Sequence, residues 1–134
     1  MNIRYATMAD LDDIASVESV CFPVLEAATK EEFEQRIKYF GNHFWLMFEG
    51  EKLIAFVDGF VTDEADLTDE MYEKAELHNE YGAWQMIFGV NTIPACRRHG
   101  YAGELICRAI QDAKKQGRKG PVSYTHLRAH ETDS

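Results

Sequence analysis

The feature that most constrains this chain is a short glycine- and arginine-containing loop, Arg97–Gly103, between an apolar segment and an amphipathic one. Residues 84–90 are mostly apolar, which predicts a central strand that is buried on both faces. Beyond the loop, apolar side chains recur at helical spacing up to Gly117, a residue that suits a helix end. These side chains are Leu105, Ile106, Ala109, Ile110 and Ala113. A buried strand, a loop and an amphipathic helix in this order predict an α/β fold.

The composition of the loop predicts an anion-binding site. Its glycines let the main chain approach a ligand closely. Free amides at the N-terminus of the following helix, together with Arg97 and Arg98, favour the oxygens of a phosphate group. A pyrophosphate cradle is therefore one interpretation, and an ordinary turn is the other, because glycine pairs between a strand and a helix are common in turns.

Start, stop and turn signals predict the other elements. Thr7 with Asp10, and Thr29 with Glu32, resemble capping boxes that begin two helices. Pro23 ends the first helix, because proline disfavours helical geometry in the residue before it. The predicted elements are a strand at 3–5, a helix at 8–20, a helix between Thr29 and Gly41, a hairpin of strands 44–49 and 53–61 that turns at Gly50–Glu51, and a partly helical segment at 68–77.

The net charge of −9 argues against a broad nucleic-acid-binding surface, because the phosphate backbone would be repelled. The charges are unevenly distributed along the chain. Residues 63–80 hold eight of the 23 acidic residues, and residues 97–119 hold seven of the 14 basic residues. One surface could thus meet an anionic ligand and another a cationic one, and two solvated faces without a ligand are the open alternative.

Length and composition indicate the class of protein. A chain of 134 residues is enough for one domain with a single core. No apolar stretch approaches the about 20 residues of a membrane helix, and the N-terminus lacks the apolar core of a secretory signal, so we expect a cytoplasmic protein. Three widely spaced cysteines without a Cys-x-x-Cys motif predict reduced thiols rather than a disulfide framework or a zinc site.

The loop carries a family resemblance. Arg97-x-x-Gly100-x-Ala102 matches the Arg/Gln-x-x-Gly-x-Gly/Ala signature of the GCN5-related N-acetyltransferases (GNAT), in the strand–loop–helix setting that the family requires. Residues 22–28 (FPVLEAA) and 84–90 (WQMIFGV) further resemble the arylalkylamine N-acetyltransferase branch. The resemblance covers roughly residues 1–120 and implies a mixed, mainly antiparallel sheet that is flanked by helices.

The resemblance also implies that acetyl-CoA is the cosubstrate, without a metal. In the family, the loop amides hold the pyrophosphate, and the preceding strand bonds to the pantetheine arm and orients the thioester. Carried over by position, the coenzyme contacts are Val90, Asn91, Thr92, Arg98, His99, Gly100, Tyr101, Ala102 and Gly103.

Catalysis in such enzymes needs a base for the amine and an acid for the departing thiolate. The arylalkylamine enzymes place histidines on the central strand, but Met86 and Phe88 stand at the corresponding positions here. The remaining candidates for the base are Glu26, Glu64, His78 or an ordered water. Glu26 could equally be a bracing carboxylate of a cap or loop, and His78 lies in a polar run for which plain solvent exposure is the simpler interpretation.

The end of the chain departs from the family pattern. Residues 121–134 hold a single Val and a single Leu, too few apolar side chains for the expected strand and second layer. We therefore expect a partial GNAT domain at 1–120, a non-family tail at 121–134, and a sheet that lacks its C-terminal strands. His126 and His130 lack a third ligand for a metal, and Tyr124 lies ahead of the family's tyrosine acid.

The function expected from the resemblance is transfer of an acetyl group from acetyl-CoA to a primary amine, on a small molecule or a basic peptide. Two alternatives stay open: a module that binds acetyl-CoA without turnover, and a protein or peptide N-acetyltransferase. An unpaired apolar strand edge would also favour pairing with a second copy of the chain, so a homodimer is a further expectation. No nucleic-acid or membrane partner is expected.

Overall fold

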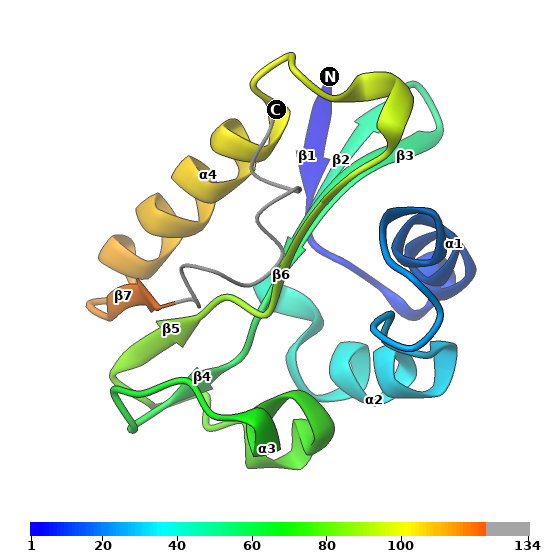
Figure 1. Cartoon of the computed structure of the whole chain (residues 1–134). Helices are drawn as coiled ribbons and strands as arrows, with labels where there is room; N and C mark the ends of the chain where they lie inside the picture. The colour runs from blue at the N-terminus through cyan, green and yellow to red at the C-terminus, as the bar shows by residue number, and fades with distance from the viewer. Residues whose placement is uncertain (123–134) are drawn as a thin grey trace.

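The computed structural model describes residues 1–122 as two sheets with helices on both sides (Figure 1). The larger sheet has the strand order β1-β2-β3-β6 and the smaller one the order β4-β5-β7. The strands are β1 (Asn2–Arg4), β2 (Phe44–Glu49), β3 (Lys52–Asp58), β4 (Val61–Thr62), β5 (Trp84–Met86), β6 (Gly89–Thr92) and β7 (Lys119–Val122). The α-helices are α1 (Leu11–Cys21), α2 (Lys30–Phe40), α3 (Asp69–Glu73) and α4 (Tyr101–Lys115). Every strand pair is antiparallel except β5–β7, which confirms the expected mixed, mainly antiparallel α/β fold.

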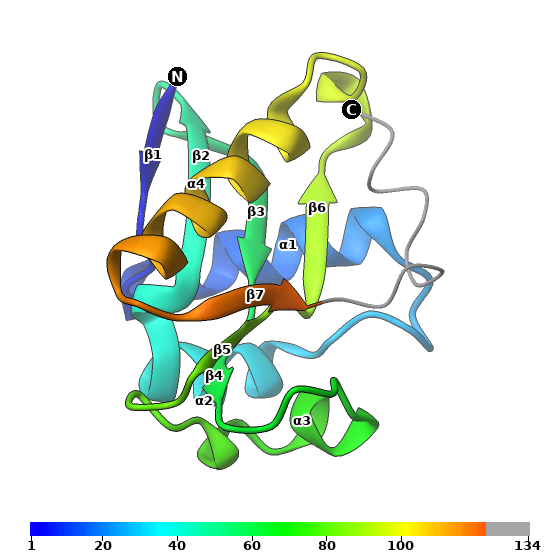
Figure 2. The ribbon, with the colours of Figure 1, turned by 90° about the vertical axis from the view of Figure 1, so that its left-hand side faces the viewer.

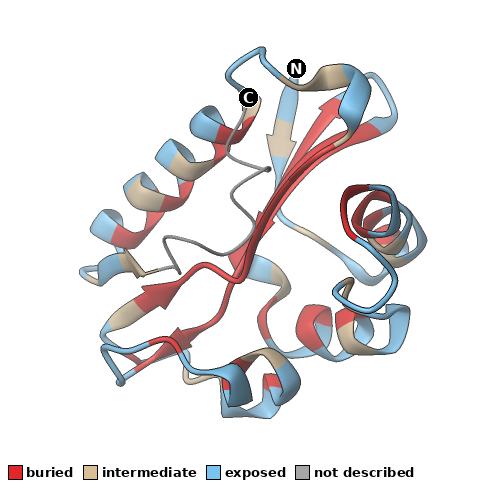
Figure 3. Cartoon of the chain, viewed as in Figure 1, coloured by how far each residue is buried: buried red, intermediate tan, exposed pale blue. Residues whose placement is uncertain are grey.

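The helices form two layers around the larger sheet (Figures 1 and 2). Helices α1 and α2 cover one face, and α4 lies along the other. Figure 3 shows that the buried residues of α4 lie on the side of the helix toward the sheet, and Ala102, Leu105 and Ala109 belong to the core on that side. The amphipathic pattern of the sequence therefore determines which side of α4 is buried.

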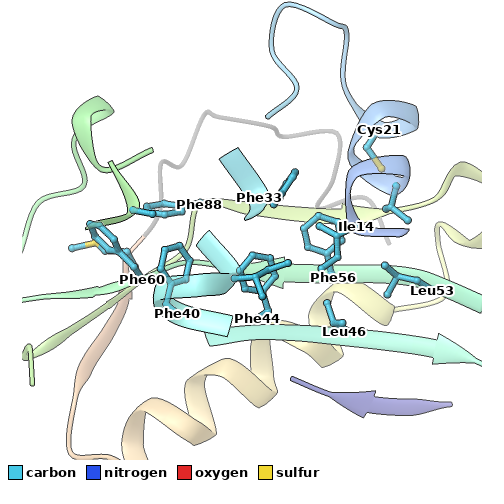
Figure 4. Packing of buried hydrophobic residues seen from close by; sticks show 14 of the residues in the cluster. Ile14, Cys21, Phe33, Phe40, Phe44, Leu46, Leu53, Phe56, Phe60 and Phe88 are labelled. Atoms are coloured by element: carbon cyan, nitrogen blue, oxygen red, sulfur yellow. The ribbon is translucent and has the colours of Figure 1, made fainter. Parts of the chain in front are cut away.

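The core under α1 and α2 is built mainly of phenylalanines (Figure 4). Phe33 and Phe56 meet edge to face with ring centroids 5.8 Å apart, and Phe60 and Phe88 lie 5.0 Å apart. Phe40 stacks on Phe44 at 5.8 Å. Edge-to-face and offset pairs of this kind add to the free energy gained from burial, so this cluster fixes α2 on the sheet.

The helix boundaries follow the signals in the sequence. Thr29 accepts a hydrogen bond from the Glu32 amide at 3.1 Å, and the Glu32 carboxylate accepts one from the Thr29 amide at 2.9 Å. Thr7 and Asp10 form the second capping box, ahead of a 3-10 turn (Met8–Asp10) that leads into α1. Helix α1 ends at Cys21, directly before Phe22 and Pro23. The structure confirms these predictions. The sequence could make them because a cap depends on residues only a few positions apart.

The predicted hairpin is confirmed as β2 and β3, with Gly50 at a φ of 61° in the turn. Strand β3 stops at Asp58, earlier than the predicted residue 61, and Val61 pairs in the smaller sheet instead. Gly59 explains the break, because a Cβ there would lie 2.0 Å from the Met86 carbonyl oxygen. The close approach of the two main chains redirects this strand.

The predicted strand 84–90 is interrupted, and its two halves have different partners. The Ile87 amide donates to the Val122 carbonyl at 2.8 Å, whereas the next amide, of Phe88, donates to the Asp58 carbonyl at 2.7 Å. The first half, β5, therefore belongs to the smaller sheet, and the second half, β6, belongs to the larger one. This irregularity separates the two sheets at residues 87–88.

Two further elements differ from the sequence expectation. The segment 68–77 forms two short helices, α3 and a 3-10 turn at Ala75–Leu77, instead of one. Strand β7 begins at Lys119 and pairs in parallel with β5, where the sequence offers little apolar side chain for a strand. Main-chain hydrogen bonds to β5 supply its partners. Tyr124, His126 and His130 lie outside the described residues. The expectation that further C-terminal strands are missing also concerns residues outside the described part of the chain.

Within residues 1–122, none of the helices combines the length and apolarity needed to cross a bilayer.

Helix α4 is held to the sheet by a buried carboxylate. Asp112 accepts hydrogen bonds from the Trp45 indole at 2.8 Å and from the Tyr5 hydroxyl at 2.7 Å. Burial and the neighbouring Asp112 raise the pKa of Tyr5, so the phenol stays a donor. The contact joins α4 to β2 and to the segment after β1.

We expect Asp112→Ala to lower the free energy of unfolding by about 1–3 kcal/mol, because it leaves the buried indole N–H of Trp45 without an acceptor. Urea denaturation measures the change. Gln111→Ala, at the exposed neighbouring position of α4, is the matched control and should stay within about 0.5 kcal/mol. Equal effects of the two substitutions would contradict this role of Asp112.

Candidate functional site

The loop between β6 and α4 is bent sharply and braced from within. A 3-10 turn (Pro94–Cys96) leads into it, and Arg98 and Gly100 adopt left-handed φ angles of 67° and 80°. The Arg97 Nε atom donates to the Thr92 carbonyl at 2.9 Å, which ties the loop back to the end of β6. The His99 ring packs on Tyr101, with centroids 5.5 Å apart. Arg97 thus shapes the loop, and Arg98 and His99 are its exposed basic residues.

The N-terminus of α4 has the features of an anion site. The helix begins at its N-cap Gly100, a residue with no side chain that could cap it. Among the described residues, no other part of the chain lies within 4 Å of a Cβ built on Gly100 or Gly103, so a ligand can approach the first turn there. The side chain of Ala102 is buried. The positive end of a helix dipole favours phosphate oxygens, so this terminus is compatible with a pyrophosphate group.

Strand β6 offers a free main-chain edge beside this loop. The Ile93 amide donates to the Ile54 carbonyl at 3.0 Å. Alternate residues of an antiparallel strand bond to the same neighbour, so the N–H and C=O of Val90 face away from β3. Within residues 1–122, β6 is the last strand of its sheet. The main chain of Val90 can therefore bond to an extended ligand.

The side chains of Asn91 and Thr92 are fully buried and have other neighbours. Asn91 Nδ2 donates to the Glu18 carboxylate at 2.8 Å. The Thr92 carbonyl accepts from Arg97 Nε and also lies 3.4 Å from the Cys21 thiol. Asn91 therefore joins β6 to α1, and the main chain of Thr92 joins β6 to Arg97 and Cys21. The assignment of Asn91 and Thr92 as direct coenzyme contacts stays a prediction.

The described part of the central strand carries no base where the resemblance would place one. Met86 and Phe88 are buried in the core under α1 and α2. Of the other candidates, Glu26 is exposed in the connection between α1 and α2, and Glu64 is exposed after β4. No hydrogen bond or ion pair among the described residues joins any two of Glu26, Glu64 and His78, so they do not form one catalytic cluster.

His78 is not simply exposed to solvent. Its side chain is 5% exposed and belongs to a cluster with His43 and Glu80. Glu80 accepts from the Nε2 atoms of His78 at 2.7 Å and of His43 at 3.0 Å. Arg118 lies 3.5 Å from the same carboxylate. The cluster joins the starts of β2 and β5 to the segment after α4.

Burial lowers the pKa of both histidines, so their neutral forms are favoured, and the Glu80 carboxylate only partly offsets this. Partial burial alone would raise the pKa of Glu80, but the hydrogen bonds from His78 and His43 outweigh it and lower this pKa. The resulting state is one carboxylate between two neutral imidazole rings.

The ligand atoms of His43, His78 and Glu80 lie within 4.8 Å of one another, close enough to surround a metal ion. The hydrogen bonds favour protons instead. The Val61 amide donates to His78 Nδ1 at 3.0 Å, so the proton of the neutral ring is on Nε2, the atom that a metal would need. Arg118 adds a positive charge beside Glu80. We therefore assign no metal to this cluster.

Two buried charged residues were missed by the sequence analysis. Glu18 lies in the apolar stripe of α1, between Val17 and Cys21, and Arg36 lies in that of α2, beside Phe33. Arg36 bonds to Asp58 at 3.1 Å and to the Tyr72 carbonyl at 3.1 Å. A charged residue inside an apolar stripe is a readable signal that a buried partner exists, but the sequence does not name that partner.

Comparison with known families agrees with this geometry. The family described as "Acetyltransferase (GNAT) family" matches residues 11–132. The chain belongs to the GNAT acetyltransferase family. The match continues past residue 120, where the sequence analysis places a domain boundary, and that boundary stays a prediction. No curated protein matches the sequence significantly.

Solved GNAT structures share the fold at low sequence identity. The loading GNATL domain of CurA from Lyngbya majuscula has a TM-score of 0.83 at 21% identity, over 92% of this chain and 64% of that one. The GNAT-like decarboxylase GphF, in complex with isobutyryl-CoA, has a TM-score of 0.80 at 23% identity, over 92% and 65%. The aminoglycoside 6'-N-acetyltransferase AAC(6')-IG from Acinetobacter haemolyticus has a TM-score of 0.69 at 20% identity, over 98% and 84%. The chain thus spans about two thirds of the first two structures.

We expect Gly100→Ala to weaken acetyl-CoA binding about tenfold, because a Cβ would enter the open space at the α4 N-terminus that the proposed pyrophosphate takes up. Isothermal titration with acetyl-CoA measures the affinity. Gly117→Ala is the matched control, because Gly117 has a similar φ of 75° and open space, but follows the opposite end of α4. Both substitutions should cost about 1–2 kcal/mol of stability by backbone strain, and only the first should change binding. Equal affinities would contradict the cradle.

We expect the chain to lose stability as the pH falls from 7.5 to 5.5. The unfolded histidines take up protons near pH 6.5, whereas His43 and His78 resist protonation in the fold, so the unfolded state binds more protons in this range. His78→Gln should flatten the dependence of the unfolding free energy on pH, and His99→Gln, an exposed control, should not. A slope unchanged by His78→Gln would contradict the assignment.

Proposed function

We propose that the protein is an N-acetyltransferase that transfers the acetyl group of acetyl-CoA to a primary amine. The observation that carries the proposal is the N-terminus of α4, which begins at Gly100 of the Arg97–Gly103 loop, next to an edge of β6 that pairs with no other described strand. Together they match the two parts of a CoA thioester: a charged pyrophosphate for the loop and an extended amide-containing arm for the strand.

The reaction is a direct transfer between two substrates. The amine nitrogen attacks the thioester carbonyl carbon, the C–N bond forms, and the C–S bond breaks. The amine loses a proton to a base, and the CoA thiolate takes up a proton as it leaves. Holding the thioester along β6 supplies orientation, which accounts for much of the rate in such reactions.

Met86 and Phe88 of the central strand hold no proton acceptor, so the proposal takes the base from another element or from water. One candidate for the base is Glu26, in the connection between α1 and α2, and the other candidate is a water molecule. The amine must lose a proton during the transfer, and an exposed carboxylate or a water molecule can accept it.

The acidic surface supports a cationic acceptor. A hollow of about 250 Å³ lies between α2 and the segment formed by α3 and the following 3-10 turn. Its acidic lining residues are Glu31, Glu32, Glu73 and Glu76. Their negative charge attracts a protonated amine or a basic peptide during the encounter. A protein or peptide substrate is distinguished from a small amine by whether acetylation needs residues that flank the amine.

A second candidate function is decarboxylation of a carboxylated acyl-CoA. The two solved structures with the highest TM-scores reported above are a loading GNATL domain and a GNAT-like decarboxylase. The lack of a base at Met86 and Phe88 is compatible with this chemistry, because loss of CO₂ needs no amine to be deprotonated. A CoA-binding module without turnover is the remaining alternative.

Incubation of the purified chain with acetyl-CoA and, in turn, tryptamine, spermidine and a lysine-containing peptide tests the proposal. We expect release of the CoA thiol and an acetylated product, by mass spectrometry, with at least one amine. Release of CO₂ from malonyl-CoA without any amine acetylation would favour the second candidate. Saturable acetyl-CoA binding with neither product would leave a binding module and refute both activities.

A further inference from the structure

Glu18 is a buried carboxylate at a junction of three segments. It lies on α1 and is 1% exposed. One of its oxygens accepts from Asn91 Nδ2 of β6 at 2.8 Å, and the other accepts from the Ala28 amide at 2.9 Å. Ala28 lies in the connection between α1 and α2. One side chain therefore links a helix, the strand that borders the coenzyme loop and a surface connection.

The base of the connection also lies against β6. Cys21, the last residue of α1, lies with its thiol 3.4 Å from the Thr92 carbonyl of β6, and Phe22 is buried. Farther along, Val24 and Leu25 are 89% and 96% exposed. The base of the connection thus lies against β6, and the apolar side chains at its tip, Val24 and Leu25, are exposed to solvent.

A buried carboxylate such as that of Glu18 is a costly way to stabilise a fold. Burying a carboxylate is costly even when it is hydrogen-bonded, and an apolar pair of similar size commonly stabilises a core as well or better. A polar pair instead restricts geometry, because its hydrogen bonds tolerate few arrangements. Asn91 also keeps a buried Oδ1 atom without a hydrogen bond, so the pair is not optimised for stability.

We propose that Glu18 is a positioning residue, which holds the α1–α2 connection against β6 as one wall of the acceptor site. The inference rests on the proposed function, because an amine that attacks a thioester along β6 must pass the elements packed beside that strand. Glu18 itself is too deeply buried to touch the amine, so it acts through the Ala28 amide and Asn91.

The central experiment compares Glu18→Leu with Glu18→Gln. The leucine removes both hydrogen bonds, and we expect the KM of the amine to rise about tenfold, with acetyl-CoA affinity changed less than about twofold. The glutamine can keep both bonds, because its oxygen accepts from Ala28 and its amide donates to Asn91 once the carboxamide of Asn91 turns. It should therefore retain the KM and the kcat of the parent chain. Ser19→Leu, on the exposed side of α1, is the control.

A double variant separates positioning from a loss of stability. Glu18→Leu combined with Asn91→Val removes both partners and should recover most of the Tm lost in Glu18→Leu. The KM of the amine should stay raised, because the connection is still not anchored. Recovery of the KM together with the Tm would overturn the proposal, as would loss of kcat in Glu18→Gln, which would make Glu18 a base.

Amide hydrogen exchange at Ala28 tests the anchor without any turnover. The rate should rise at least tenfold in Glu18→Leu and stay near that of the parent chain in Glu18→Gln. An unchanged rate in Glu18→Leu would overturn the anchor even if amines are acetylated. If the parent chain acetylates none of the amines tested, the proposed function and the acceptor role fail together, and exchange at Ala28 still decides whether Glu18 holds the connection.

Discussion

The rest of the structure depends on the point at which the segment 84–92 changes its hydrogen-bonding partner. The Ile87 amide bonds to β7 and the Phe88 amide bonds to the end of β3, so two successive residues serve different sheets. The sheets separate there, and β6 is left with one free edge among the described residues. The same segment then leads into the loop and α4, which places the N-terminus of α4 near the end of β6 (Figure 2).

Buried polar pairs keep this arrangement in register. Arg36 bonds to Asp58, whose carbonyl accepts from Phe88, so the pair lies against the point of separation. Glu18 and Asn91 join α1 to β6 a few residues farther along. Each pair interrupts an apolar helix stripe and is costly to bury. Both occur where the strand must hold one geometry, and the surrounding core consists of apolar side chains, many of them phenylalanines (Figure 4).

This arrangement separates binding from chemistry. In the proposed function, main-chain groups of the loop and of the β6 edge hold the CoA thioester, so binding depends little on side-chain identity. The choice of reaction then depends on what approaches the strand and on the groups around it. Because Met86 and Phe88 hold no proton acceptor, the proposal assigns that choice to the α1–α2 connection and to the acidic residues of α2, of α3 and of the 3-10 turn after α3. Solved structures with this fold include both an N-acetyltransferase and a decarboxylase.

The sequence by itself determined the features that depend on neighbours in the chain. The two capping boxes, the stop at Phe22–Pro23, the turn at Gly50 and the loop signature are local patterns, and the structure has the elements that they predict. Only the tertiary structure decided the break at Ile87–Phe88, the pairing of β7 and the partners of Glu18, His43 and His78. Glu18 and Asn91 are 73 positions apart. Contacts over such separations depend on how whole elements pack, and no spacing within one element encodes which partner a buried charge will meet.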